Sequence, residues 1–271
     1  MSAQADNTPK GAVQPQAPRE SRTVIIPAAT IVGLLVLWQL ACSTGLVPQF
    51  LLPSPVAVVQ ALIKDAPLIL GHTATTLLEA AAGLAIGVAV GFALAVAMDR
   101  FEGLYLALNP LMTISQTIPT IAIAPLLVLW FGYGLAPKVI LIVVTTFFPV
   151  TVSLVSGFRS VDPDVIDLLR TMSASRWQIF WYAKLPAAAD QFFSGLKISA
   201  TYAIVGAVIA EWLGGFSGLG VYMTRVRKSF SYDKMFASII VVSALSLVLM
   251  RLVDLVEYLC LPWKRAERNK K

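Results

Sequence analysis

The residue types that usually carry out covalent chemistry are scarce in this sequence. Its 271 residues include one histidine, His72, and two cysteines, Cys42 and Cys260. One histidine excludes a multi-histidine metal site, and two cysteines cannot form a disulfide framework. The HExxH, CxxC and GxSxG motifs are absent, as is the Gly-Lys pair of a phosphate-binding loop. We therefore expect no catalytic residue, no metal and no cofactor on this chain, so that any ATP and magnesium must be bound by a partner.

Polar side chains within long apolar stretches are the remaining candidates for function. Intramembrane ionisable groups are costly and mark functional sites by default, although Glu79 and Glu211 could also reach an interface from near the ends of their stretches. Glu211 could instead pair with a basic group of a loop. A proline frees a backbone carbonyl that a polar pore interior can satisfy. Together with rings that could stack on a planar solute, the candidate path residues are Gln116, Thr117, Pro119, Tyr202, Glu211 and Trp212.

The composition places these stretches in a membrane. Apolar residues make up 57% of the chain and charged residues 13%, against roughly 45–50% and about 25% in soluble domains. The mean hydropathy is +0.76. These values exclude a soluble enzyme and a disordered chain. The net charge of +6 does not indicate nucleic-acid binding, because much of the basic charge lies in the tails and loops.

Six segments have the roughly 20 apolar residues that a spanning helix needs. They predict an all-α integral membrane protein with a disordered tail over 1–22, a six-span domain over 23–262 and a basic tail over 263–271. Most Lys and Arg residues fall on the side that holds both tails, which places both termini in the cytoplasm. Prolines 110, 119 and 125 predict kinks or a broken start in the third segment. The segments are Thr23–Cys42, Thr75–Met98, Leu106–Phe131, Lys138–Val155, Phe192–Leu213 and Met235–Leu259.

Small residues recur at every fourth position in the second and fifth segments. Such rows let helix backbones approach closely in lipid, so tight helix packing is the favoured interpretation, with lining of the pathway as the alternative in the fifth segment. The rows are Gly83, Gly87, Gly91 and Ala95, and Gly195, Ser199, Ala203 and Ala207.

The cytoplasmic connection over 158–191 is long for a helix bundle, where about 2–8 residues are usual. It predicts two short amphipathic helices. Asp162 and Asp164 favour the start of the first, at about 163–172. The second begins near Ser175, and Leu185-Pro186 is expected to end it. From physics alone, these helices could also rest on lipid headgroups.

This connection resembles the EAA loop of the membrane subunits of binding-protein-dependent ABC importers. Asp167-Leu168-Leu169 stands at the E-A-A position, Ser173 at the glycine, and Ile179 with Leu185-Pro186 at the end of the motif. The departures are Asp for Glu, Leu for both alanines and Ser for Gly. The resemblance assigns a two-helix coupling loop that docks on an ATPase, comprising Asp167, Leu168, Leu169, Arg170, Thr171, Met172, Ser173, Ala174, Ser175, Arg176, Trp177, Ile179, Leu185 and Pro186.

The resemblance implies the permease subunit of an ATP-driven importer in a bacterial inner membrane. The implied partners are two ATP-binding subunits, a periplasmic or lipid-anchored binding protein, and a second copy or a homologous permease. The stretches 198–202, 206–208 and 210–214 are most similar to permeases for riboflavin and for pyrimidine thiamine precursors. Sulfonate, taurine or nitrate import is the alternative within the same branch.

Two other classes of membrane protein compete with this interpretation. A stand-alone secondary transporter would need coupling acids near mid-membrane or an internal repeat. A membrane-embedded enzyme would need clustered Asp, His, Cys or Ser-Lys groups. The sequence shows neither arrangement.

Overall fold

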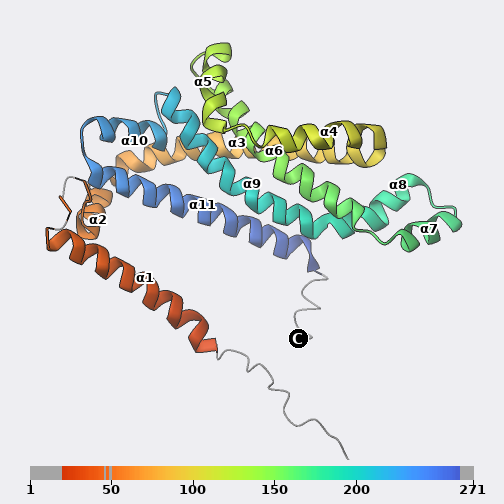
Figure 1. Cartoon of the computed structure of the whole chain (residues 1–271), viewed down its shortest axis with the longest axis horizontal. Helices are drawn as coiled ribbons and strands as arrows, with labels where there is room; N and C mark the ends of the chain where they lie inside the picture. Colours follow the sequence, from red (N-terminus) through yellow and green to blue (C-terminus); the bar gives the residue numbers. More distant parts are fainter. Residues whose placement is uncertain (1–19, 46, 49–50, 263–271) are drawn as a thin grey trace, which may run out of the picture. The chain divides into compact units, whose positions relative to one another are not determined.

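The computed structural model describes residues 20–45, 47–48 and 51–262. In these ranges the regular structure is helical (Figure 1). The chain divides into two units, residues 1–55 and 56–271. The helices are α1 (Glu20–Ser43), α2 (Pro55–Lys64), α3 (Ala66–Arg100), α4 (Glu102–Ser115), α5 (Thr120–Phe131), α6 (Leu135–Arg159), α7 (Pro163–Thr171), α8 (Arg176–Ile179), the π-helical η1 (Phe180–Lys184), α9 (Leu185–Leu213), α10 (Leu219–Lys228) and α11 (Tyr232–Cys260).

The first unit consists mainly of α1, an apolar helix whose stretch Ile25–Ser43 is long enough to cross a membrane. The Trp38 Nε1–H donates to the Pro53 carbonyl at 3.1 Å, so the chain after the helix folds back on it. Because α1 begins at Glu20, the expected tail over 1–22 overlaps the helix by three residues. The rest of that tail and the expected tail over 263–271 lie outside the described residues.

The core of the second unit is built from α3, α6 and α9, and small residues explain why these helices lie so close together. A Cβ atom added at Gly91 on α3 would lie 2.6 Å from the Phe147 carbonyl oxygen of α6. A Cβ atom added at Gly195 on α9 would lie 2.7 Å from the Pro149 carbonyl oxygen of α6. All eight residues of the two predicted rows are buried. The prediction of close packing is therefore confirmed.

The third expected span is not one helix. It consists of α4 and α5, which are bent by 99° at the break between residues 115 and 120. Pro119 precedes α5 with an extended backbone; its missing N–H and the restriction that its ring places on Ile118 both oppose a continuous helix at this point. The described residues therefore contain five helices able to cross a membrane, or up to six if the bent pair counts as one.

The amphipathic pair exists, but its second helix does not end where expected. Asp162 caps α7 by accepting from the Asp164 N–H at 2.9 Å, and Ser175 forms a capping box with Gln178 at the start of α8. Beyond α8 the chain stays helical through η1 into α9. The expected end at Leu185-Pro186 is wrong: Pro186 lacks a backbone donor, but the π-helical turn η1 just before it carries the chain on into α9. The connection between helices is thus shorter than 158–191.

Candidate translocation site and coupling loop

Helix α7 presents an apolar face that no other part of the described chain covers. It has no buried residue, and Leu168 and Met172 are 60% and 71% exposed. Asp167 and Arg170 pair with each other at 2.9 Å on the exposed surface. In Figure 1, α7 and α8 lie at one end of the helix bundle and α10 lies at the other. An amphipathic helix in this position has a free face for another subunit.

Ser173 explains the sharp turn between α7 and α8. Its φ is +60°, a left-handed conformation in which glycine is favoured. The Ser173 N–H donates to the Arg170 carbonyl and the Ala174 N–H to the Leu169 carbonyl, both at 2.9 Å. These two bonds form a Schellman motif, the usual C-terminal cap with glycine at this position. Ser173 therefore occupies the conformation that the glycine of the EAA pattern would take.

Aromatic packing fixes α8 to the body of the second unit. The ring of Phe180, at the start of η1, lies 5.4 Å from that of Phe158 on α6, and Trp177 stacks on Phe180 at 5.7 Å. Lys184 bonds Asp99 at the end of α3, with 2.6 Å between Nζ and Oδ1. Ile179 is buried. A displacement of α8 would therefore be transmitted directly to α6 and α9.

The other predicted coupling residues extend along the same segment. They do not form one short loop, because α9 begins before its end. Leu169, Arg170 and Thr171 lie in the last turn of α7, and Met172, Ser173, Ala174 and Ser175 form the turn after it. Arg176 and Trp177 are in α8, and Leu185 and Pro186 open α9.

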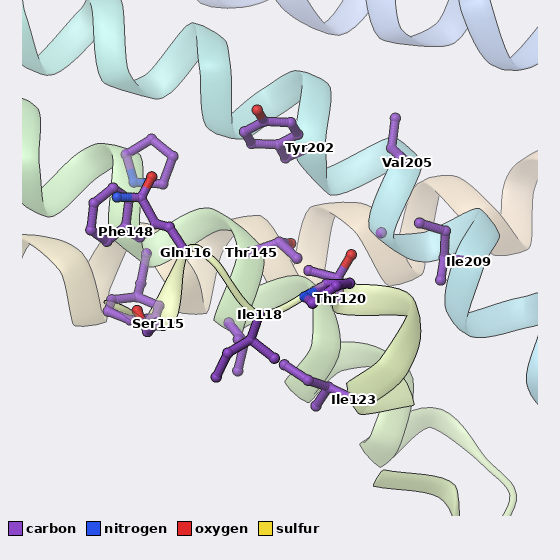
Figure 2. A pocket seen from close by; sticks show the side chains of 15 residues that line it. Ser115, Gln116, Ile118, Thr120, Ile123, Thr145, Phe148, Tyr202, Val205 and Ile209 are labelled. Carbon is purple, nitrogen blue, oxygen red and sulfur yellow. The ribbon is translucent and has the colours of Figure 1, made fainter. Parts of the chain in front are cut away.

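A cavity of about 570 Å³ lies beside the break between α4 and α5. Residues of the break and of the adjoining parts of α4 and α5 form one part of its lining, and residues of α6 and α9 form the rest (Figure 2). Three of the six predicted path residues, Gln116, Pro119 and Tyr202, line it. The lining also includes Ser115, Thr120, Thr145 and Phe148. The cavity thus lies between a broken helix and two core helices.

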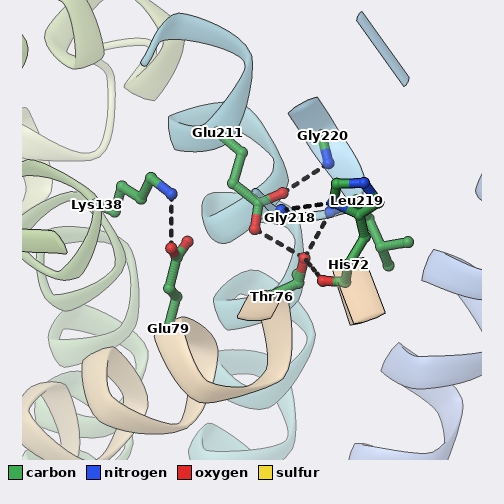
Figure 3. A network of polar contacts seen from close by, with 8 residues as sticks. All are labelled: His72, Thr76, Glu79, Lys138, Glu211, Gly218, Leu219 and Gly220. Carbon is green, nitrogen blue, oxygen red and sulfur yellow. Dashed lines mark hydrogen bonds and ion pairs between the residues drawn. The ribbon is translucent and has the colours of Figure 1, made fainter. Parts of the chain in front are cut away.

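The remaining predicted path residues lie elsewhere. Thr117 is in the break, but its hydroxyl donates to the Ile114 carbonyl at 2.8 Å and it does not line the cavity. Trp212 is 42% exposed near the end of α9. Glu211 is 1% exposed and belongs to a separate polar network (Figure 3).

In this network, side chains from α3 and α9 bind the first backbone N–H groups of α10. Gly220 N–H donates to Glu211 Oε2 at 2.6 Å, and Leu219 N–H donates to the Thr76 hydroxyl at 2.8 Å. Gly218 N–H donates to His72 Nδ1 at 3.0 Å. Thr76 also bonds Glu211 Oε1, at 2.7 Å. Because the first N–H groups of a helix have no partner within the helix, these contacts cap α10 and hold it against the bundle.

A buried ion pair lies next to this cap. Lys138 Nζ is 2.6 Å from Glu79 Oε1, and the two residues are 5% and 4% exposed. The second oxygen, Glu79 Oε2, has no hydrogen-bond partner among the described residues. The expectation that Glu79 reaches an interface is wrong: it pairs with Lys138, the first residue of the fourth expected segment.

Asp65 holds the start of α3 to two other helices. Its Oδ2 accepts from Lys234 at 2.7 Å and from the Tyr222 hydroxyl at 2.8 Å. The hydrogen bond from Lys234 is the main reason that the pKa of Asp65 is held below its usual value, with Tyr222 adding to the effect against the opposing effect of burial. Burial and the same carboxylate raise the pKa of Tyr222.

Sequence reasoning missed three members of these contacts. His72 was considered only as a possible metal ligand, Thr76 was not singled out, and Lys138 was counted as a loop residue. A polar residue every three or four positions, at 72, 76 and 79 in an apolar helix, was the available signal.

Comparison with known proteins identifies the family of this chain. The model of the family described as "Binding-protein-dependent transport system inner membrane component" matches residues 83–258. A probable ABC transporter permease of Haemophilus influenzae is 40% identical over 83% of this chain and 92% of its own length. The formylaminopyrimidine transport permease ThiX of Halalkalibacterium halodurans is 34% identical over 92% of this chain and 100% of its own length. The riboflavin permease RibX of Chloroflexus aurantiacus is 33% identical over 87% of this chain and 88% of its own length.

Among solved structures, an amino acid ABC transporter matches with a TM-score of 0.58 at 18% identity, covering 74% of this chain and 95% of that one. At this identity the match supports the fold alone. The family model covers more than half of the chain, and close relatives span nearly all of it. The chain therefore belongs to the binding-protein-dependent transport system inner membrane components, and it is a multi-pass permease subunit of an ABC importer.

Proposed function

We propose that this permease imports a small heteroaromatic compound, either a pyrimidine precursor of thiamine or riboflavin, and that a separate ATPase drives it through α7 and α8. The observation that carries the coupling role is the uncovered apolar face of α7, with Leu168 and Met172 exposed beyond the long helices. An exposed apolar stripe of this kind marks a contact with another protein or with lipid headgroups, and the resemblance of this segment to the EAA loop favours the ATPase.

The substrate proposal rests on relatives that cover most of the chain, 92% for ThiX and 87% for RibX. ThiX and RibX are 34% and 33% identical, whereas the taurine permease TauC of Escherichia coli is 28% identical. The difference favours a ring compound over a sulfonate. Sulfonate, taurine or nitrate import is the second candidate, supported by the same family membership.

The proposed assembly contains two permease subunits, two ATP-binding subunits and one substrate-binding protein. ATP and magnesium are bound by the ATPase subunits. Both termini of the permease lie in the cytoplasm, which puts α7 and α8 on the side where ATP is available. The excess of Lys and Arg on that side supports this orientation.

Uptake measured in cells that carry this chain, its ATPase and its binding protein tests the substrate. Labelled riboflavin, a labelled thiamine-type pyrimidine and labelled taurine are supplied in parallel, with a strain lacking the ATPase as control. Uptake of a ring compound that depends on the ATPase is expected. Uptake of taurine alone would refute the substrate proposal, and uptake without the ATPase would refute the coupling proposal.

Coupling is tested separately with Leu168→Asp, which places a charge on the apolar face of α7. The permease should remain in the membrane while uptake falls at least tenfold and ATP hydrolysis no longer responds to the binding protein. Asp164→Asn is the matched control, because it changes a charge in the first turn of the same helix without altering an apolar residue. Normal uptake by Leu168→Asp would count against docking of the ATPase on α7.

A further inference from the structure

We propose that the cavity beside the α4–α5 break binds the transported compound directly, with the ring of Tyr202 stacked on a neutral aminopyrimidine and the amide of Gln116 bonded to the polar edge of that ring. The proposal rests on the proposed function and specifies its substrate site. It concerns residues of the α4–α5 break, α6 and α9 that no comparison assigns to binding.

The size and position of the cavity suit a small ligand. Its volume of about 570 Å³ lies within the range of roughly 300–1,000 Å³ that is usual for small-molecule sites. The cavity adjoins a 99° bend in a membrane segment. In transporters, discontinuous helices commonly form the substrate site, because irregular backbone is tolerated only where it lines a cavity.

The lining argues for a neutral ligand. Among the described residues that form it, none is Asp, Glu, Lys, Arg or His. A sulfonate or nitrate ion would lose its hydration there without meeting a counter-charge, which is strongly unfavourable. A neutral heteroaromatic ring loses much less on entry and gains contact with an apolar wall that includes Phe147, Phe148 and Ile209.

The polar groups of the lining are available to a ligand. No side-chain hydrogen bond ties Gln116, Thr120 or Tyr202 to another described residue, whereas the Thr145 hydroxyl donates to the Ile142 carbonyl at 2.8 Å. A glutamine amide offers one acceptor and two donors side by side. A ring nitrogen next to an exocyclic amino group presents the matching acceptor and donor, the pairing by which Gln reads adenine.

Tyr202 is placed to stack on such a ring. Ala200 and Ala203 on the same helix are fully buried, but Tyr202 is 49% exposed and lines the cavity (Figure 2). Stacking of a base on an aromatic side chain contributes about 1–3 kcal/mol, which corresponds to a change in binding of about 5-fold to 150-fold.

The test measures ATP-driven uptake of a labelled 4-aminopyrimidine and of taurine into vesicles containing the complete importer. The variants are Tyr202→Leu, which removes the ring, Tyr202→Phe, which keeps it, and Gln116→Met, which removes the amide at similar length. The matched control is Tyr258→Leu, a tyrosine on α11 that is 53% exposed and does not line the cavity. ATP hydrolysis stimulated by the binding protein is recorded for each variant to show that the importer is assembled.

The expected result is aminopyrimidine uptake that falls about tenfold or more in Tyr202→Leu and Gln116→Met, with Tyr202→Phe and Tyr258→Leu near the wild type. If the wild type takes up the aminopyrimidine but Tyr202→Leu stays within twofold of Tyr258→Leu, the proposed function stands and the binding site is refuted. If the wild type takes up taurine alone, the proposed substrate fails, and a neutral-ligand site fails with it.

Discussion

The ion pair between Lys138 and Glu79 allows a quantitative test of how the core is held together. The two side chains are 2.6 Å apart, and both residues are at most 5% exposed. Removing one partner of a buried pair leaves an uncompensated charge and costs about 3–5 kcal/mol, whereas replacing both by apolar residues is often neutral or stabilising. We therefore expect Lys138→Met and Glu79→Leu each to destabilise the permease by about 3–5 kcal/mol. The double variant should lie close to the wild type.

The free energy of unfolding is measured by titrating the purified permease in detergent micelles with a denaturing detergent and following its helix content. Because each single variant is expected to lose about 3–5 kcal/mol and the double variant almost nothing, the expected coupling energy in the double-mutant cycle is about 6–10 kcal/mol. Glu102→Gln is the control, because Glu102 pairs with Arg159 at 3.0 Å on the exposed surface, where a pair contributes at most about 1 kcal/mol. Additive losses in the double variant would show that the two charges do not depend on each other, and would refute this reasoning.

Three further predictions follow from other contacts. Ser173→Gly should raise the midpoint of thermal unfolding and keep full uptake, because glycine relieves a cost of about 1–2 kcal/mol at positive φ. Ser173→Val should lower both the midpoint and the uptake. Equal midpoints for the Gly and Val variants would contradict the Schellman turn. Glu211→Leu should loosen α10 and expose it to proteolysis, since it leaves the Gly220 N–H without its partner at a cost of about 1–3 kcal/mol; Glu211→Gln, which keeps an acceptor, should stay resistant. Because the pKa of Asp65 is lowered in the folded protein, its charge stabilises the fold above the unfolded value of about 3.9 and loses that contribution as the pH falls through the folded value. Asp65→Asn should thus lower stability at pH 6–8 by a constant amount that begins to shrink below about pH 4 and disappears once the pH is below the folded pKa, and a loss that varied across pH 6–8 would contradict this assignment.

Some packing could be predicted from sequence because it depends on residue size at a fixed spacing. A repeat of small residues every four positions needs no knowledge of the partner helix, and the α3 and α9 rows are both buried against α6. The pairing of Lys197 with Asp254, at 2.7 Å, could also be predicted from the sequence, because both residues lie near the same end of adjacent expected spans.

Other contacts could not be predicted because they join residues that are far apart in the chain. Glu79 and Lys138 are 59 positions apart, and Thr76 and Glu211 are 135 apart. Hydropathy placed Lys138 at the very start of an expected span and gave no partner for either acid, since it measures the cost of burying a charge but does not identify the charge that compensates it. Tertiary structure decides whether such a group reaches the interface or is paired inside.

The prolines indicated where a helix could be interrupted, but not whether the helix would end, bend or continue there. Pro119 stands at a 99° break, while Pro125 and Pro149 lie inside helices, and Pro186 lies in the first turn of α9. The same residue type ends, bends or begins a helix according to where the missing N–H falls. For this reason the cavity beside the break could not be located from the sequence, although Gln116 and Pro119 were recognised as candidates.

The helical run from Arg176 to Leu213 connects the features to which we assign function. It is 38 residues long; its first turn contains Trp177 in the aromatic cluster, Tyr202 lines the cavity, and Glu211 caps α10 near its end. Close-packed interfaces such as that between α6 and α9 move as units and do not deform continuously. An ATPase bound to α7 and α8, as proposed, would therefore move one wall of the cavity together with the cap on α10. The break between α4 and α5 forms the opposite wall, so that relative motion of the two walls would open or close the proposed site while the buried core remains intact.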